Sequence, residues 1–517
     1  MKPEILHSLK GYKKTDLISD LMAGLMVAII ALPLSIALGL QSGVTLQVGI
    51  MTAIVAGFFI SLLGGSRYQI GGPTAAFVVI ILGYLQNPDI GVSGLAIATV
   101  AAGVILIILG YLKAGSLVRY IPYPIVIGFT TGIGITLMTG QLKDLLGLTL
   151  PDGTGSEFLH KIAAYAENIS TVNFYTLLVG AVTIALIYLL PKVSKKIPAS
   201  FVAILAATLL TLLIDFLTGG ASNISTIEST YGNVKAEFKL IDLSGIANVK
   251  IPSLIMPAVV IAFLCAIESL LSATVADGMT GSTHSSNQEL VGQGAANIFS
   301  ALLGGLPATG AIARTAAGIN NGAKSPLTGI FHALFLLVMY VVLMPVVKFI
   351  PLTGLAAILI TVSIKMANFP VFIRLSTFGI RDTIVLIVTC LLTVIFDLTY
   401  GVIGGFALCL ILNARNIIKP VKITEEKAEG KTLTLKAEGR VYFISVCRLI
   451  DRIEKSAADF DEFILDFKNI DRIDVTSVER LAKLDKALNR TGKNLKIING
   501  AAAVDHRYTR FVNEIFH

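Results

Sequence analysis

Charged residues are scarce in this sequence. Only 14% of its 517 residues are charged and 54% are apolar, which gives a mean hydropathy of +0.80. Soluble proteins carry about 25% charged residues, so this composition excludes an ordinary soluble protein. At roughly 20 apolar residues per membrane-spanning helix, the chain can cross a bilayer more than a dozen times. The composition therefore indicates a polytopic membrane protein.

Cysteine is also rare, and Cys265, Cys390, Cys409 and Cys447 are far apart. Without paired spacing they predict neither a disulfide framework nor a zinc site. The net charge of +8 is the lysine and arginine excess expected in cytoplasmic loops, so no nucleic-acid partner is expected. The sequence lacks a nucleophile elbow and a Walker loop, and thus enzyme chemistry has no support.

About fourteen apolar runs are bounded by glycine, proline or charge. They are residues 21–40, 45–63, 73–85, 92–112, 121–141, 174–190, 199–217, 253–275, 290–305, 307–318, 326–347, 352–366, 383–397 and 400–418. Lysine and arginine concentrate in alternate loops on the side of the N-terminus. We therefore expect both termini in the cytoplasm of a multi-pass protein of the inner (plasma) membrane.

Two runs, 73–85 and 307–318, are too short to span a bilayer, and each follows a glycine-rich break that contains a proline. Each is the third run of a set of seven, and their separation nearly equals that of the first and eighth runs. Because seven is odd, the second copy would be inverted in the membrane, as in many secondary transporters. Glycine and proline are common in membrane helices anyway, so an unduplicated chain is the alternative.

A helix that begins inside the membrane presents unpaired N–H groups and about half a positive charge. If helices begin at Pro73 and Pro307 and face each other, they form an anion site in which Thr74 and Thr309 add hydroxyl donors. Arg314, two turns beyond Pro307, is then a fixed cation for the anion. Alternatively, Arg314 lies near a helix end and extends to the membrane interface.

Glu268 interrupts an apolar run, where ionisation costs at least about 2.5–3.5 kcal/mol. Ser272 is one helical turn further on the same face. A carboxylate and nearby hydroxyls suit Na⁺, so Glu268, Ser272 and Thr309 are candidate ligands. Alternatively, Glu268 carries H⁺ or is a counter-ion for Arg314.

Other acidic residues are assigned structural roles. The polar segment with Asp277, His284, Gln288 and Glu289 has no zinc-ligand spacing and is expected to be a cytoplasmic loop with capping and turn contacts. Asp20 and Asp382 just precede apolar runs and are expected at helix starts.

Charge becomes much denser after Pro420, which predicts a membrane domain of residues 1–419 and a second domain of residues 420–517. Strands are expected at 433–435, 441–446, 463–467 and 495–498, and helices at 447–457, 475–489 and 503–515. This alternation is typical of a small α/β domain.

Together these features resemble the SulP (sulfate permease) family of anion transporters with a C-terminal STAS domain. The resemblance rests on four segments of the membrane domain: Asp20–Pro33, Gly65–Ala75, Asn287–Gly294 and Gly304–Thr315. It implies an all-α domain of about 14 spans, arranged as a 7+7 inverted repeat with two broken helices, plus a cytoplasmic α/β STAS domain. It also implies a homodimer that transports a small inorganic anion, sulfate or bicarbonate, by alternating access with H⁺ or Na⁺ coupling and no other cofactor.

In the family the anion is held between the third and tenth helices. The matching residues are Thr74, Ala75, Ala76, Thr309, Gly310 and Ala311. Glu268 matches the acidic residue that the family associates with cation coupling. Many sulfate-transporting members have Gln after the first-helix proline, whereas Leu34 and Ser35 follow Pro33 here, which weakens sulfate specificity. A dicarboxylate transporter, or a membrane-tethered STAS signalling protein, is the alternative.

The tail resembles STAS domains through Ile464–Phe467 and Ile470–Ser477. Thr476 falls where related bacterial proteins carry a phosphorylated hydroxyl residue, which implies a regulatory role. Alternatively, Thr476 caps the helix that is expected near Val475.

Overall fold

The computed structural model describes residues 2–115, 121–151, 158–194, 198–232, 235–238, 240–241, 250–396, 398–417 and 421–498. By packing, the chain divides into two compact units, Met1–Val118 with Ile133–Lys365 and Arg119–Gly132 with Met366–His517. This division places the last helices before residue 419 with the C-terminal sheet. The boundary at residue 419 stays a prediction.

The first unit contains helices and one pair of very short strands. These elements are α1 (Ile5–Ser8), α2 (Lys14–Gln41), α3 (Leu46–Leu63), β1 (Gly71–Gly72), α4 (Ala75–Gln86), α5 (Gly91–Tyr111), the greater part of α6 (Tyr123–Leu146), α7 (Phe158–Glu167), η2 (Ile169–Thr171), α8 (Phe174–Val193), α9 (Ala199–Leu217), α10 (Ile227–Tyr231), α11 (Ile251–Thr280), α12 (Ser286–Leu302), β2 (Thr309–Gly310), α13 (Ile312–Asn320), α14 (Leu327–Val347) and most of α15 (Leu352–Ala367). In the part of the chain that the structure describes, nine helices are long and apolar enough to cross a membrane.

Each of the fourteen predicted apolar runs coincides with a helix. The helix ends differ, because several helices continue past the apolar run into polar sequence. For example, α2 begins at Lys14 rather than near residue 21, and α12 begins at Ser286 rather than at 290. The all-helical membrane fold is confirmed.

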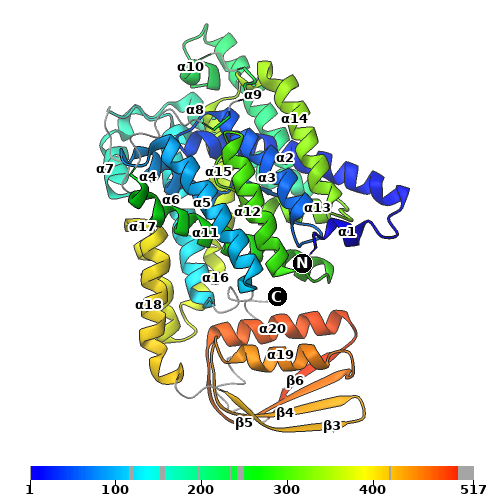
Figure 1. The fold of residues 1–517 in the computed structure, drawn as a ribbon. Helices are drawn as coiled ribbons and strands as arrows, with labels where there is room; N and C mark the ends of the chain where they lie inside the picture. Colours follow the sequence, from blue (N-terminus) through cyan, green and yellow to red (C-terminus); the bar gives the residue numbers. More distant parts are fainter. Residues whose placement is uncertain are drawn as a thin grey trace. The chain divides into compact units, whose positions relative to one another are not determined.

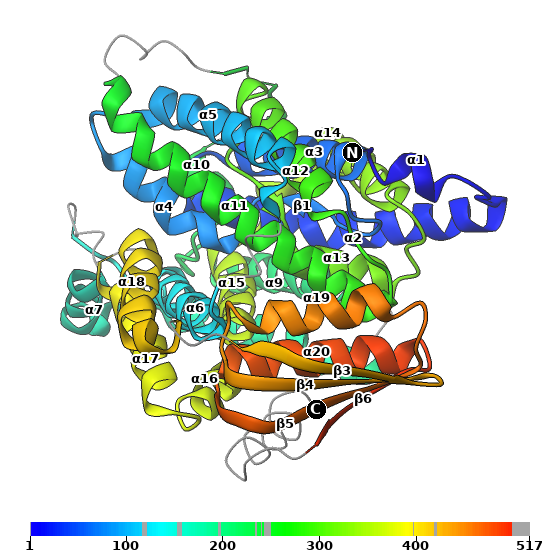
Figure 2. The same cartoon turned by 60° about the horizontal axis from the view of Figure 1, so that its bottom comes forward.

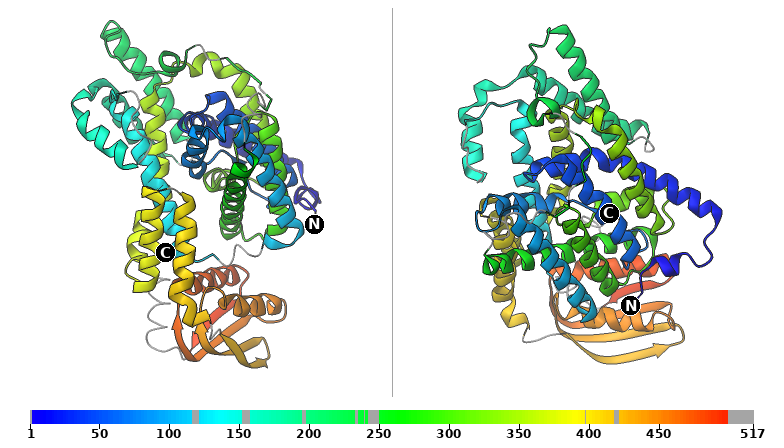
Figure 3. Two further views of the ribbon diagram at one scale, coloured as in Figure 1. Left: turned by 60° about the vertical axis from the view of Figure 1, so that its left-hand side comes forward. Right: turned by 45° about the horizontal axis from the view of Figure 1, so that its top comes forward.

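The two halves of this unit interleave, as the blue and green helices of Figure 3 show. In the predicted repeat, α2, α3 and α5 correspond to α11, α12 and α14. The contacts follow the same correspondence, since α14 packs on α2 and α3 while α5 packs on α11 and α12. Gly103 of α5 is so close to α12 that a Cβ atom there would lie 2.6 Å from the Gly294 oxygen. This exchange of partners supports the duplicated plan.

The two broken helices meet at their strands. β1 and β2 pair antiparallel, with Gly71 opposite Gly310 and Gly72 opposite Thr309. The first helix begins at Ala75, close to the expected position, but the prediction that the second begins at Pro307 is wrong, since α13 begins at Ile312. The reason is Asn297 of α12, whose side chain bonds both the N–H and the C=O of Ala308 (2.9 and 2.8 Å) and holds this backbone extended.

The second unit combines the start of α6 with three further helices and an α/β domain. Its other elements are the end of α15, α16 (Phe369–Leu375), α17 (Ile380–Ile395), α18 (Leu398–Ile417), β3 (Lys422–Glu429), β4 (Thr432–Val441), α19 (Val446–Ser456), β5 (Glu462–Ile473), α20 (Val475–Arg490) and β6 (Asn494–Ile498). The sheet order is β3-β4-β5-β6, with an antiparallel first pair and two parallel pairs. Figures 1 and 2 show α19 and α20 side by side along this sheet.

Most of the predicted elements in this domain are confirmed. The prediction of a strand at 441–446 is wrong, because β4 ends at Val441. A turn follows, in which the Tyr442 N–H donates to the Ser445 hydroxyl, and it leads into α19. β3 was not predicted, since Lys422–Glu429 is a charged edge strand without an apolar face. The helix expected at 503–515 lies outside the described residues.

Candidate functional site

The site is built around the β1–β2 ribbon. Because the strands are antiparallel, α4 and α13 leave the ribbon in opposite directions, and the first turns of both helices lie next to it. In any helix the N–H groups of the first turn have no acceptor within the helix, and they carry partial positive charge. The ribbon therefore brings together the positive ends of two helices.

Two of the backbone N–H groups that were expected to bind the anion already have hydrogen-bond acceptors within the protein. The Gly310 N–H donates to the Ser269 hydroxyl (3.1 Å), and the Ala311 N–H donates to the Ile70 oxygen (3.0 Å). The first turn of α13 thus starts at Ile312, which is 41% exposed, whereas Ala75 and Ala76 at the start of α4 are 7% and 1% exposed. The assignment of anion contacts to these residues stays a prediction.

Glu268 lies next to both threonines. The Thr74 hydroxyl donates to its carboxylate at 2.8 Å, and the Thr309 side chain is a second hydroxyl neighbour. The Ser272 hydroxyl, one turn further along α11, donates to the Thr315 hydroxyl of α13 at 3.4 Å. The structure therefore brings together Glu268, Thr74 and Thr309, and the role of Ser272 stays a prediction.

Arg314 lies in the first turn of α13 and is 1% exposed. Its Nη1 donates to the Gly71 oxygen and its Nη2 to the Ser35 hydroxyl, both at 3.0 Å. The alternative that Arg314 extends to the membrane interface is therefore wrong, as is its expected place two turns into the helix. Among the residues that the structure describes, Arg314 makes no ion pair with Glu268, so the counter-ion alternative also lacks support.

Gly72 makes room for the guanidinium group. Its φ of +155° lies in the region that favours glycine, and a Cβ atom there would lie 1.5 Å from Arg314 Nη1. Ser35, which lies two residues after the first-helix proline Pro33, is buried and accepts a hydrogen bond from Arg314. Gly71 of the ribbon and Ser35 of α2 therefore hold the positive charge of Arg314 close to the two helix starts. Helix starts with a nearby cation can bind an anion.

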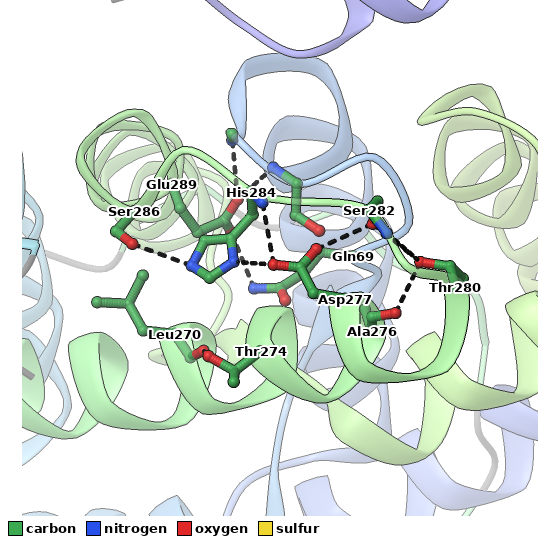
Figure 4. Close-up of polar contacts among 12 residues, drawn as sticks. Gln69, Leu270, Thr274, Ala276, Asp277, Thr280, Ser282, His284, Ser286 and Glu289 are labelled. Atoms are coloured by element: carbon green, nitrogen blue, oxygen red, sulfur yellow. Dashed lines mark hydrogen bonds and ion pairs between the residues drawn. The ribbon is translucent and has the colours of Figure 1, made fainter. Parts of the chain in front are cut away.

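Sequence reasoning missed a set of buried polar residues. Glu289 was expected in a loop but lies in α12 and is fully buried, and Gln288 bonds the Leu63 oxygen of α3 at 2.7 Å. Asp277 was also expected in this loop but lies in the last turns of α11. His284 does lie in the loop, and Asp277 accepts hydrogen bonds from the His284 backbone and from Ser282, as the expected turn contacts require. Figure 4 shows the His284 ring between Asp277 and Ser286, with Glu289 and Gln69 in the same view.

A sequence signal for this set exists. Glu289, Gln293 and Asn297 follow one another at intervals of four, which places them on one face of α12. All three are fully buried. A polar face within an apolar helix predicts buried hydrogen-bond partners.

Asp20 was also misplaced. It lies inside α2, is fully buried, and accepts hydrogen bonds from Tyr12, from the N–H of Lys324 and from the hydroxyl groups of Ser325 and Thr328. It therefore fixes α2 to the turn between α13 and α14. Asp382 does lie in the first turn of α17, as expected.

Thr476 is not the cap of α20. Asp474 is, since its carboxylate accepts from the Ser477 N–H at 2.8 Å. The Thr476 hydroxyl is buried and accepts a hydrogen bond from the Tyr123 N–H at 2.9 Å. Its regulatory role stays a prediction.

Comparisons with known proteins match this architecture. Residues 17–389 match the sulfate permease family and residues 423–513 match the STAS domain. The chain is 34% identical over 501 residues to the putative sulfate transporter YvdB of Bacillus subtilis, covering 95% of this chain and 92% of that protein. It is 30% identical over 517 residues to the bicarbonate transporter BicA of Picosynechococcus, covering 94% and 89%.

Solved structures agree. The transmembrane domain of a cyanobacterial bicarbonate transporter BicA superposes with a TM-score of 0.67 at 30% identity, covering 76% of this chain and 99% of that one. The overall structure of SLC26A9 gives a TM-score of 0.70 at 19% identity, covering 98% and 89%, which shows the shared fold. The family and its named relatives are transporters rather than enzymes. This chain is therefore a member of the sulfate permease family with a C-terminal STAS domain.

Proposed function

We propose that the protein is a secondary active transporter of a small inorganic anion, sulfate or bicarbonate, which binds between the starts of α4 and α13. The observation that carries the proposal is the β1–β2 ribbon, which joins two helix starts and holds Arg314 behind them. Unpaired N–H groups and a fixed cation form a site for an oxyanion. Relatives named as sulfate and bicarbonate transporters support these two substrates.

Glu268 couples transport to H⁺ or Na⁺ in this proposal. Its neighbours Thr74 and Thr309 contribute hydroxyl groups, and a hydroxyl group can donate to a carboxylate or turn a lone pair toward a cation. Oxygen atoms are the ligands that hard cations prefer. Ser272, one turn along α11 from Glu268, is the third hydroxyl group proposed for the cation. No cofactor besides the coupled ion is proposed.

The transport cycle follows the alternating-access scheme of inverted-repeat transporters. In this proposal the protein lies in the inner (plasma) membrane with both termini in the cytoplasm, and it acts as a homodimer. The STAS domain regulates transport or assembly, with Thr476 as the candidate phosphorylation site, and contributes no group to the anion site.

The test is uptake by the purified protein in liposomes. Labelled sulfate, bicarbonate, oxalate and fumarate are offered separately, with and without Na⁺ or pH gradients, and unlabelled chloride is added as a competitor. We expect uptake of sulfate or bicarbonate that one gradient drives. Uptake dominated by oxalate or fumarate would instead indicate a dicarboxylate transporter. Protein that moves none of these anions would favour a signalling role for the STAS domain.

A further inference from the structure

The carboxylate of Glu289 is enclosed by N–H donors. One of its oxygens accepts from the backbone N–H groups of Gly65 and Ser66 (2.8 and 3.0 Å), and the other accepts from the side-chain amides of Gln69 and Gln293 (2.8 and 2.9 Å). Four donors occupy the acceptor positions of an ionised carboxylate. The group is therefore held in place by the segment between α3 and β1 and by its own helix.

Gln69 connects this carboxylate to the ribbon. Its amide also donates to the Ser269 oxygen of α11 at 3.1 Å, and Ser269 in turn accepts from the Gly310 N–H. The Gln69 side chain lies directly against Gly310, where a Cβ atom would lie 2.0 Å from Nε2 and 2.4 Å from Cδ. Gln69 is 2% exposed. It thus fills the space between α11, α12 and β2.

We propose that Gln69 is a positioning residue for the anion site and that Glu289 acts through it. Gln69 sets the distance of β2 from α11 and α12, and hence the place of the α13 start, while Glu289 fixes the orientation of the Gln69 amide. This inference depends on the proposed function. It assigns Gly310 a role besides leaving room for the anion, because its missing side chain accommodates Gln69.

Two double-mutant cycles on the purified full-length protein test the proposal, with labelled sulfate and bicarbonate binding as the readout. Gly310→Ala should push Gln69 aside and weaken binding about tenfold, within the range measured for coupled neighbours. In a Gln69→Ala background the same substitution should have no effect, because the clashing side chain is gone. If Gly310→Ala is equally harmful in both backgrounds, Gln69 does not position β2.

The second cycle concerns Glu289. Glu289→Gln replaces one acceptor oxygen by an NH₂ group. The Gln69 amide, whose Oε1 has no hydrogen-bond partner in the described structure, can then turn over to accept from this NH₂ group. That turn gives up its bond to the Ser269 oxygen, so binding should weaken. In the Gln69→Ala background this loss should vanish. A loss of the same size in both backgrounds would mean that Glu289 does not act through Gln69.

Gln293→Ala is the matched control, because it removes a similar donor from the same carboxylate but does not lie at Gly310. Gly310→Ala should remain harmful in that background. Thermal unfolding is measured for each variant. If Gly310→Ala alone does not fold, recovery of folding in Gln69→Ala/Gly310→Ala supports the contact, and failure to recover contradicts it. Absence of binding by the unaltered chain would reject the proposed function, whereas normal binding with additive effects would reject this inference alone.

Discussion

Glu289 and Glu268 lie on neighbouring helices, and the groups around their carboxylates differ in kind. Glu289 of α12 receives only N–H groups, two of them from the backbone. Glu268 of α11 has hydroxyl neighbours, Thr74 and Thr309. An N–H group can only donate, whereas a hydroxyl group can also accept. The first region is therefore suited to hold a fixed negative charge, and the second to gain and lose a cation.

The difference separates two roles that sequence alone does not distinguish. Both residues are acidic groups in or next to apolar runs, where an unpaired charge is costly. The donors come from segments far away in the chain, the 65–69 segment for Glu289 and the ribbon for Glu268. What a buried acid does thus depends on which atoms the fold brings to it.

The largest expected effect comes from Gly72→Ala, which disrupts the ribbon that serves Glu268. The new Cβ atom would lie 1.5 Å from Arg314 Nη1, so either the guanidinium group or the strand must move. Either movement displaces the strand or the cation that the proposed anion site depends on, so anion affinity should fall about a hundredfold, roughly 2.8 kcal/mol. Calorimetric titration with sulfate or bicarbonate measures this.

Gly83→Ala is the matched control, because it lies in α4 with open space around it. Its affinity should equal that of the unaltered protein. Equal affinity in the Gly72→Ala protein would show that the anion binds away from the ribbon.

A direct comparison of the two acids is the next test. Glu268→Gln should abolish the dependence of uptake on a Na⁺ or pH gradient while leaving anion exchange measurable, because the amide can still accept a hydrogen bond from Thr74 but carries no charge. Glu289→Gln should keep gradient dependence and lose only affinity. Liposome uptake with imposed gradients measures both. Gradient-driven uptake by the Glu268→Gln protein would contradict the coupling role.

Hydropathy and glycine–proline breaks were sufficient to predict the helices and the meeting of two broken helices. These features follow from local composition, which the membrane constrains strongly. The start of α13 could not be predicted from Pro307, because Asn297 of another helix keeps the following backbone extended.

The candidate site was predicted only in part. The breaks predicted that Thr74 and Thr309 lie near each other, but the contact of Glu268 with Thr74 joins the middle of α11 to a segment about 194 residues away, and no local pattern indicates it. The structural roles of Asp20 and Glu289 were predicted from their position beside an apolar run. Their hydrogen-bond partners, however, lie in distant segments of the chain. A charged residue at the edge of an apolar run looks like a helix start whether or not the helix extends beyond it.

Arg314→Lys should have a smaller effect. Arg314 uses two nitrogens for Gly71 and Ser35, and a single ammonium group cannot reproduce this planar fork. Losing one charge-assisted hydrogen bond costs about 1.5–3 kcal/mol, so affinity should fall at least about tenfold. Ser35→Ala removes the same bond from the other side and should have a similar effect. A much larger loss for Arg314→Lys would indicate that the guanidinium group also contacts the anion in two places.

The smallest expected effect concerns Asp474, another buried carboxylate held by N–H groups, here from Ser477 and Phe443. Asp474→Ala removes the cap of α20 and should cost about 1 kcal/mol. Hydrogen exchange of the α20 amides in the full-length protein should then be roughly fivefold faster. Asp474→Asn keeps the capping acceptor for Ser477 but turns its NH₂ group toward the Phe443 N–H, so its exchange rate should lie between those of the unaltered protein and the Ala variant. If the Ala variant is not faster, this cap does not stabilise α20.

The pH dependence of the same amides has a definite sign. Burial raises the pKa of Asp474 above its ordinary value of 3.8, although the N–H groups of Ser477 and Phe443 oppose this. Between the ordinary and the raised pKa, the folded domain binds more protons than the unfolded one, so its stability falls as the pH rises through this window. Asp474→Asn should remove this trend from the exchange rates. An opposite slope would show that the N–H groups outweigh burial, and Asp474 would then resemble a favourably held anion, as proposed for Glu289.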